Sequence, residues 1–379
     1  MTLVFLTNFI NHHQVHVADE FYKLLGDGYK FIATEPVPDA FIQKGYPIFE
    51  RNYLVKAYED KTMLDYAYKL AEDADVAIIG SAPESFVRKR LEANKLTFHY
   101  SERWFKSGYK SLLSPRFWRF AYKYHLKYRN SRSYMLCASA YTAHDVNLIG
   151  AYKNKCFRWG YFTKVEDLDI NELSRKFNIT PKTIHFMWCA RFLKFKHPEL
   201  PVKLAARLKS KGYKFMIDMF GSGEELEATK NLAKKLNVED VVNFCGSKPN
   251  DEILAEMRRH DIFLFTSDRN EGWGAVLNEA MSNGCSVVVS DKIGAVPFLI
   301  DDGVNGCIFK SCNLDSLEQK VIFFIEHPSE RQNMARSAYH TMSRIWSPAN
   351  AARQFIQLVY ALMAGDESGI PNIGPGTRV

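Results

Sequence analysis

The chain has 379 residues, of which 46% are hydrophobic and 25% are charged, and its formal net charge at pH 7 is +7. This length exceeds what one hydrophobic core usually holds and favours a globular protein with two domains. The modest positive charge permits an anionic substrate or membrane surface and does not indicate nucleic-acid binding.

The composition also restricts the class and compartment of the protein. No run of about eighteen apolar residues occurs, so the sequence predicts no transmembrane helix. The first seven residues begin a strand pattern and lack the basic start and cleavage site of a signal peptide. The seven cysteines form no Cys-x-x-Cys pair, which is typical of reduced thiols rather than of disulfides or zinc ligands. We therefore expect a cytoplasmic protein.

Short apolar runs alternate with amphipathic segments of helix length along the whole chain. In the first half we expect strands at residues 3–7, 31–34, 76–80, 96–100 and 134–139. In the second half we expect strands at residues 184–190, 214–220, 241–245, 262–266, 285–290 and 307–310. Alternating strands and helices imply parallel sheets with helices on both faces. So many strands exceed one usual open sheet, which predicts an α/β protein with two doubly wound, Rossmann-like domains.

The polar, turn-rich stretch 160–181 is the expected boundary between the domains. It separates an N-terminal domain at 1–165 from a C-terminal domain at 182–345. Ser347 and Pro348 form an N-cap and first-turn pair, so we expect one last helix at 347–364. Residues 366–379 contain Gly and Pro with little apolar content, and we expect them to form a loose tail.

Chemically active residues gather where the predicted strands of the second half end. Ligands of open parallel sheets bind beyond the C-terminal ends of the strands. Those ends carry two basic residues, two glycine-rich turns and two carboxylates, which are Arg191, Lys196, Gly221, Ser222, Gly223, Glu271, Gly272, Gly274 and Glu279. Cations and the free N–H groups of a helix start bind phosphates, whereas carboxylates beside them suit sugar hydroxyls. The pattern therefore predicts a nucleotide-sugar site.

These motifs resemble those of the retaining nucleotide-sugar glycosyltransferases of the GT-B fold, specifically glycosyltransferase family 4 (glycosyl transferases group 1). The resemblance covers residues 184–364 well and the first domain weakly. It is carried by the joint order of Arg-x4-Lys, Gly-x-Gly, Glu-x7-Glu and the Asp-Gly-Val-Asn-Gly turn at 302–306. It implies two Rossmann-like domains facing across a cleft, with the last helix crossing back to the first domain.

The resemblance also implies roles for the donor-side residues. Arg191 and Lys196 would bind the donor diphosphate, Glu271 would lie by the transferred sugar, and Glu279 would accept hydrogen bonds from the ribose hydroxyls. Glycines in the Glu271 turn would let the backbone approach the phosphates. The implied donor-binding set is Arg191, Lys196, Gly221, Ser222, Gly223, Glu271, Gly272, Trp273, Gly274, Ala275 and Glu279.

The first domain offers fewer matches. His99 ends a predicted strand and resembles the family's strand-end histidine, which faces the donor sugar; its alternative is a hydrogen-bonded core residue. Glu102 and Arg103 follow it and are expected on the acceptor side. His12 and His13 stand where many family members have a Gly-Gly loop, and because adjacent loop residues point apart, at most one of them is expected to face the acceptor. The catalytic set expected from this resemblance is His99, Glu271, Arg191 and Lys196.

No metal or other cofactor is expected, because Arg191 and Lys196 already supply cations to the diphosphate. Asp73 and Asp75 imitate a metal-binding Asp-x-Asp pair, but they precede a predicted strand and so lie at its wrong end. The resemblance implies a metal-independent, retaining transferase that moves a hexose from a UDP-sugar, or alternatively a GDP-sugar. The acceptor would be a glycan or lipid-linked glycan in bacterial surface-polysaccharide synthesis.

Other activities stay open at this point. A nucleotide-sugar epimerase or hydrolase of the same fold would share the donor site, and a non-catalytic membrane-associated partner subunit would keep the fold alone. A nicotinamide-dependent oxidoreductase is disfavoured, because the Gly221-Ser222-Gly223 turn lacks the third glycine of the dinucleotide motif.

The segment 115–129 combines basic and aromatic residues at helical spacing. Its basic stripe is Arg116, Arg119, Lys123 and Lys127, and its aromatic stripe is Phe117, Phe120, Tyr124 and Tyr128. A basic amphipathic helix is typical of binding to an anionic membrane surface, here the inner face of the plasma membrane. The alternative is an ordinary helix whose aromatic face packs into the core.

Overall fold

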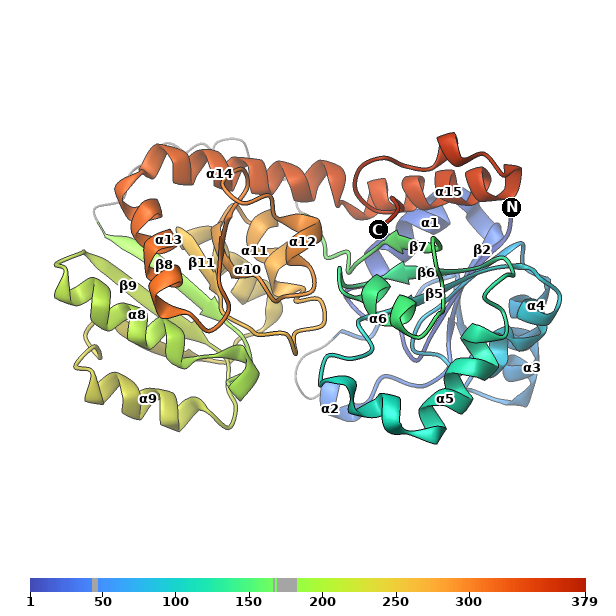
Figure 1. Ribbon diagram of the computed structural model, residues 1–379, viewed down its shortest axis with the longest axis horizontal. Coiled ribbons are helices and arrows are strands. Elements are labelled where there is room, and N and C mark those ends of the chain that lie inside the picture. The colour runs from blue at the N-terminus through green and yellow to red at the C-terminus, as the bar shows by residue number, and fades with distance from the viewer. Residues whose placement is uncertain (43–46, 166–167, 169–182) are drawn as a thin grey trace. The chain divides into compact units, whose positions relative to one another are not determined.

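The computed structural model describes residues 1–42, 47–165, 168 and 183–379. They form two compact units, the first comprising Met1–Lys164 with Ile345–Val379 and the second Val165–Arg344 (Figure 1). Most of the predicted boundary stretch, 160–181, lies outside the described residues. Among the residues that are described, no helix has the length and apolarity needed to cross a membrane.

The first unit is built on a seven-stranded parallel sheet in the order β3-β2-β1-β4-β5-β6-β7. Its strands are β1 Leu3–Thr7, β2 Tyr29–Ala33, β3 Leu54–Lys56, β4 Val76–Ile79, β5 Leu96–Ser101, β6 Ser133–Cys137 and β7 Cys156–Arg158. Its α-helices are α1 Val15–Leu25, α2 Asp39–Ile42, α3 Lys61–Asp73, α4 Arg88–Glu92, α5 Pro115–Ala121, α6 Thr142–Leu148 and α15 Pro348–Ala364.

Helices cover both faces of this sheet because its strands are apolar on both sides. Alternate strand residues such as Val4 and Ile79 pack against Ala67 of α3. On the other face α15 packs beside α1, where Phe355 meets Phe21 and also Phe98 of β5 (Figure 1). The last helix therefore belongs to the first unit, as the fold class predicted.

The C-terminal residues correct one expectation, that of a loose tail at 366–379. They pair antiparallel with the edge strand β7, where Arg158 N donates to Thr377 O at 2.7 Å and Val379 N donates to Cys156 O at 3.1 Å. Thr377 is buried. The low apolar content did not reveal this order, because backbone groups rather than apolar side chains hold the segment.

The second unit contains a six-stranded parallel sheet in the order β10-β9-β8-β11-β12-β13. Its strands are β8 Ile184–Cys189, β9 Phe215–Phe220, β10 Val242–Gly246, β11 Ile262–Phe265, β12 Ser286–Ser290 and β13 Cys307–Phe309. Its α-helices are α8 Glu199–Ser210, α9 Leu226–Lys235, α10 Asn250–Arg259, α11 Val276–Ser282, α12 Val296–Leu299, α13 Leu314–Glu326 and α14 Pro328–His340. Both sheets have the predicted doubly wound, Rossmann-like form.

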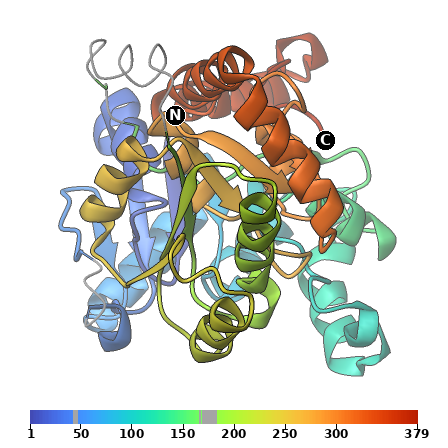
Figure 2. The ribbon, with the colours of Figure 1, turned by 90° about the vertical axis from the view of Figure 1, so that its left-hand side faces the viewer.

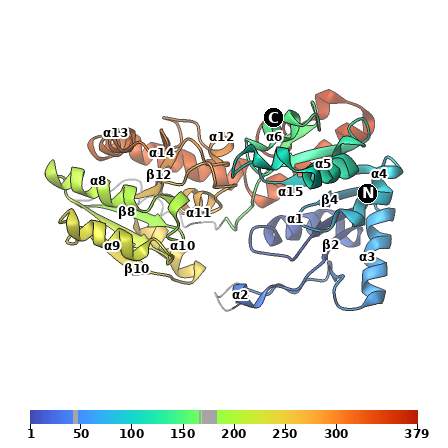
Figure 3. The ribbon, with the colours of Figure 1, turned by 60° about the horizontal axis from the view of Figure 1, so that its bottom comes forward.

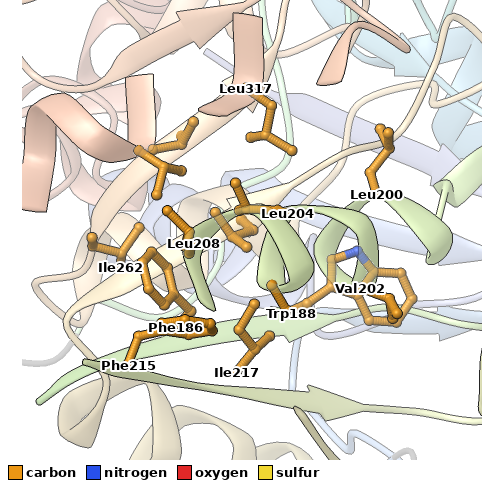
Figure 4. Close-up of a cluster of buried hydrophobic side chains, with 14 of the residues drawn as sticks. Phe186, Trp188, Leu200, Val202, Leu204, Leu208, Phe215, Ile217, Ile262 and Leu317 are labelled. Carbon is orange, nitrogen blue, oxygen red and sulfur yellow. The ribbon is translucent and has the colours of Figure 1, made fainter. Parts of the chain in front are cut away.

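The main core of the second unit lies between its sheet and the neighbouring helices α8 and α13 (Figure 2). Side chains of α8, including Leu204 and Leu208, gather with Phe186 and Ile217 of the sheet (Figure 4). Full burial of so many large apolar side chains fixes the strand positions. The strand ends that carry polar residues are therefore held on a rigid frame.

Each sheet reverses its strand order once. In the first unit the reversal lies between β1 and β4, and in the second it lies between β8 and β11. The loops that leave two such strands diverge to opposite faces, and the space between them is the usual ligand position of this architecture. A ligand-binding residue is therefore expected on the loops that follow β1 and β4 or on those that follow β8 and β11.

Candidate functional site

Lys196 and Glu271 form an ion pair across the strand-order reversal of the second unit. Lys196 lies on the loop that follows β8, and Glu271 lies on the loop that follows β11. Ser267 donates a 2.9 Å hydrogen bond to the same Oε2 atom of Glu271 that Lys196 contacts. The Lys196 and Glu271 side chains are only 12% and 13% exposed, so the pair is well screened from water. The predicted Arg-x4-Lys and Glu-x7-Glu motifs are thus brought together.

Arg191 lies two residues after the end of β8 and is exposed. Among the residues that the structure describes, no acidic side chain pairs with it. An exposed guanidinium with no carboxylate partner is suited to a phosphate oxygen, because its planar fork binds two oxygens at once. Within this described part of the chain, Arg191 is therefore an unpaired cation beside the Lys196–Glu271 ion pair, and its phosphate-binding role stays a prediction.

The loops after β8 and β11 are tied together by His197, which sequence reasoning missed. Its ring nitrogens lie 3.0 Å from Glu199 Oε1 and 3.3 Å from Asp268 Oδ2. The Glu199 hydrogen bond and the nearby Asp268 carboxylate raise the pKa of His197, against the opposing effect of burial. His197 also has a left-handed backbone with φ of 52°. Residue spacing in the sequence does not reveal such a backbone conformation, so it gave no signal for His197.

The Gly221-Ser222-Gly223 turn, whose donor-binding role stays a prediction, also has a structural role. A Cβ on Gly221 would stand 2.0 Å from Ala190 O, and one on Gly223 would stand 2.4 Å from Phe192 O. Both glycines have positive φ, and Ser222 O accepts a 2.9 Å hydrogen bond from Phe192 N. The turn therefore holds the loop after β8 by close backbone contact. Ser222 is exposed, and its hydroxyl accepts a hydrogen bond from Ser247.

The turn that begins at Glu271 is compact. Gly274 has φ of 91°, and a Cβ there would meet the Phe265 ring at 2.6 Å. The Trp273 side chain is completely buried and donates its Nε1–H to Asn278 at 2.9 Å, so only its backbone remains for a ligand. Gly272 is buried too, and Ala275 is half-buried at the start of α11. The donor-binding role of Trp273 stays a prediction, and it would be played by the backbone of this residue.

Glu279 lies on α11 with only 8% of its surface exposed. Burial raises its pKa to about 7, although a hydrogen bond from Asn250 partly opposes that effect. Burial disfavours the charged form of this carboxyl group, and a hydroxyl that donates a hydrogen bond to the carboxylate stabilises that form. Such a group suits the predicted contact with vicinal hydroxyls.

A cavity of about 600 Å³ lies within the first unit, at the ends of β1, β4 and β5. His13, His99, Glu102 and Arg103 line it, so four of the five predicted first-domain residues meet in one place; the fifth, His12, is not among the described lining residues. The other lining residues come from the same strand-end loops and from later segments, and include Asn8, Asn11, Glu84, Trp104, His125 and Tyr161. The loop after β4, which carries Glu84, obeys the same strand-end rule and could have been found by it.

The two basic side chains that line this cavity are already ion-paired. The Arg103 guanidinium binds the buried Asp145 carboxylate at 3.2 Å, and Lys106 binds Glu102 at 3.0 Å. Glu102 also accepts a 2.7 Å hydrogen bond from the Tyr161 hydroxyl. Arg103 therefore has a structural anchor that no local spacing predicted.

Burial keeps His12 and His13 of the first unit uncharged near neutral pH. Burial, with the nearby His16, lowers the pKa of His12 to about 4. Burial also lowers the pKa of His13 well below its ordinary value, and its ring stacks on Tyr161 at 5.1 Å. His99 is buried, and its Nδ1 lies 3.4 Å from Glu84 Oε1. The neutral rings of His12 and His13 can accept as well as donate hydrogen bonds.

Comparison with known proteins gives these features a context. A model of the family described as glycosyl transferases group 1 matches residues 169–341. A poly(glycerol-phosphate) alpha-glucosyltransferase of Bacillus subtilis is 30% identical over 132 residues, which are 35% of this chain and 19% of that protein. Matches to the first three curated relatives span 19% to 51% of their lengths, so this chain matches about half of each or less.

Two solved structures share the architecture. HepE of Anabaena in complex with UDP has a TM-score of 0.68 at 14% identity, covering 95% of this chain and all of that one. WaaG, a glycosyltransferase involved in lipopolysaccharide biosynthesis, has a TM-score of 0.61 at 14% identity, covering 92% of this chain and 98% of that one. These likenesses show that the chain has the GT-B fold.

Proposed function

Because residues 169–341 belong to the glycosyl transferases group 1, we propose that this protein transfers a hexosyl group from a UDP-sugar to an acceptor hydroxyl with retention of configuration. The observation that carries the proposal is the Lys196–Glu271 pair at the strand-order reversal of the second unit. The structurally similar HepE has been solved with UDP and with UDP-glucose, which supports UDP as the nucleotide.

The proposed chemistry breaks the bond between the sugar and the diphosphate. The leaving diphosphate gains negative charge, so cations fixed beside it stabilise the transition state more than the ground state. Arg191 and Lys196 supply these cations, and we propose that donor binding needs no metal. A diphosphate that accepts from Lys196 would free oxygens of Glu271 for hydroxyls of the transferred sugar.

We assign Glu271 and His99 to positioning the donor sugar rather than to covalent catalysis. In the reaction as proposed, the leaving phosphate takes the proton of the acceptor hydroxyl on the same face of the sugar. Positioning of this kind acts through orientation, which contributes strongly when two reactants must meet. Glu279, buried and with a raised pKa, would accept hydrogen bonds from the ribose hydroxyls.

The cavity of the first unit is the proposed acceptor site. Its aromatic residues, including Trp104 and Tyr161, offer faces for sugar rings, and its carboxylates accept from hydroxyls. Because both lining cations are ion-paired, we propose an uncharged sugar residue of a glycan or lipid-linked glycan as the acceptor. The role of WaaG in lipopolysaccharide biosynthesis supports surface polysaccharide as the product class.

Titration calorimetry of UDP and of GDP in EDTA tests the donor site. We expect UDP to bind the parent protein and Arg191→Ala to weaken that binding by roughly tenfold or more, because a charge-assisted hydrogen bond is lost. Glu279→Ala is expected to weaken it as well. Lys194→Ala is the matched control, since Lys194 is an exposed cation on the same loop, and it should bind like the parent.

Three results of these experiments would contradict the proposal in different ways. Binding of neither nucleotide would remove the nucleotide-sugar site. If NMR shows that the donor is converted to its epimer or to free sugar without any acceptor, the protein is an epimerase or a hydrolase. Tight UDP binding without turnover on any glycan or lipid-linked acceptor would indicate a non-catalytic partner subunit.

We also propose that the surface around α5 binds an anionic membrane at its cytoplasmic face. The predicted segment 115–129 is α5 followed by a π-helical segment, Tyr122–Leu126, and it runs along the surface of the first unit (Figure 3). Trp118 is 41% exposed and Tyr122 63% exposed, and the basic stripe is exposed around them. The alternative also holds in part, because Tyr128 is buried.

Vesicle co-sedimentation tests this surface. We expect binding to vesicles with anionic lipid and not to neutral ones, with loss of binding at high salt. Lys123→Glu should weaken binding, whereas Lys69→Glu, the same change at an exposed lysine of α3, should not. Equal binding by the two variants would contradict the proposal.

A further inference from the structure

Three potential metal ligands meet at the wall of the first-unit cavity. Glu84 stands in the turn that follows β4, His99 in β5, and His125 in the π-helical segment after α5. One ligand atom from each of them lies within 4.8 Å of the others. Both histidines are 3% exposed, and the Glu84 side chain is 15% exposed. All three line the cavity.

Four buried polar atoms of this cluster have no hydrogen-bond partner. They are Glu84 Oε2, both ring nitrogens of His99, and His125 Nε2. Buried polar atoms are almost always satisfied, because leaving one without a partner is costly. Four such atoms from three residues that face one another indicate a bound group between them. An ion or ordered water would supply the missing interactions.

The donor set favours a cation over water alone. Two imidazoles and one carboxylate form a set that binds zinc with one coordination position open. Zinc bonds of about 2.1 Å in a tetrahedron place ligand atoms about 3.4 Å apart. The ligand atoms of this cluster lie within 4.8 Å of one another. Small side-chain rotations would bring them the remaining distance of about 1.4 Å or less toward one another.

A second layer of contacts orients one of the ligands. His125 Nδ1 lies 2.6 Å from the Tyr152 hydroxyl, so its Nε2 is left to face the cluster. Metal-binding histidines usually use their other ring nitrogen in this way. Tyr152 is buried and has a left-handed backbone with φ of 55°, and such strain is often found at functional sites.

We propose that Glu84, His99 and His125 bind one divalent transition-metal ion of the zinc class, with a further coordination position open to the cavity. That position would take water or a hydroxyl of a bound sugar. The site lies wholly in the first unit and is separate from the cations proposed for the donor diphosphate. It shares His99 with the donor-sugar position and its cavity with the acceptor site proposed above, but metal binding is measured without any transferase activity.

Metal titration of the full, tag-free chain after EDTA treatment and desalting tests the site. We expect about one equivalent of Co²⁺ to bind with the visible absorption of a tetrahedral ion, and Zn²⁺ to displace it. Glu84→Gln keeps the shape of the side chain but removes its charge, and should weaken binding at least roughly tenfold. His144→Asn is the matched control, because His144 is an exposed histidine of the same unit, and it should bind like the parent.

Further measurements keep the outcome clear. Zn²⁺ should raise the melting temperature of the parent and of His144→Asn, but not of Glu84→Gln. Tyr152→Phe removes the partner of His125 and should weaken Co²⁺ binding while keeping the fold, as circular dichroism would show. Binding of no metal, or equal binding by the parent and Glu84→Gln, would overturn the proposal. UDP binding by the same samples reports the donor site separately.

Discussion

At the scale of single residues, burial changes the titration of Glu279 in the second unit. Burial moves its pKa from 4.5 to about 7. Because the folded-state pKa is raised, the protonated form favours the folded protein. Stability contributed by Glu279 is therefore full below pH 4.5 and is lost as pH rises through about 7.

Glu279 should also make nucleotide affinity depend on pH. Ribose hydroxyls would donate to the charged carboxylate, so binding must release the proton that Glu279 carries below its pKa. We expect UDP affinity to rise by up to about tenfold per pH unit below pH 7 and to level off above it. Calorimetry in buffers of different ionisation enthalpy would detect the released proton.

The Glu279→Gln variant is the control for that dependence. Its side chain cannot ionise, so its UDP affinity should be flat over the same range. A parent protein with pH-independent UDP affinity, or a Gln variant that keeps the full slope, would contradict the role given to Glu279.

Site residues differ in how far the sequence alone predicts them. Lys196 and Glu271 were found because both follow strand ends, and strand ends are visible as apolar runs. Arg103 was placed on the acceptor side, but its guanidinium is tied to Asp145, 42 residues along the chain. The meeting of Glu84 with His125 likewise depends on tertiary packing, which has no local signal.

At the scale of elements, the turn after β9 shows how one loop fixes another. The Gly221 backbone lies so close to Ala190 that no side chain fits between them. The loop after β8 starts at this contact and ends at Lys196. Its position therefore depends on a glycine that does not need to touch a ligand.

Gly221→Ala should consequently disturb both stability and the site. We expect it to lower the free energy of unfolding by more than about 2 kcal/mol and to weaken UDP binding, because the loop after β8 must move. Gly212→Ala is the comparison: Gly212 also has positive φ, but open space surrounds it, so only about 1 kcal/mol of backbone strain is expected. Urea unfolding of both variants measures the difference, and equal losses would refute the contact argument.

The sequence predicts strands well where both faces are buried. All eleven predicted strands are present, within a few residues of their expected ends. β3 and β7 were missed; each has only three residues and lies at a sheet edge, although the equally short edge strand β13 was predicted. The same edge position explains the tail, since β7 offered backbone groups that residues 376–379 could pair with.

At the scale of the whole molecule, the first unit is assembled from two distant parts of the chain. Phe355 of α15 is fully buried against Phe21, Phe98 and Trp159. The second unit is formed by one continuous stretch, residues 165–344. Changes near the C-terminus should therefore act on the first unit.

Deletion of residues 371–379 tests this assignment. It removes three backbone hydrogen bonds with β7, which are worth about 1 kcal/mol each. We expect hydrogen exchange to accelerate in β6 and β7, while β8 to β13 keep the exchange rates of the parent. Faster exchange spread evenly over both units would show that the tail does not act through β7.

The split of the first unit sets an order for folding during synthesis. A ribosome delivers residues 165–344 in full before α15 emerges, so the second unit can complete its core while the first still lacks Phe355. Until then, the aromatic surface around Phe21 and Phe98 has no helix to cover it and is open to chaperones. A nascent chain of which only residues 1–344 have left the exit tunnel would carry a finished second unit and an unfinished first one, the reverse of their order in the message.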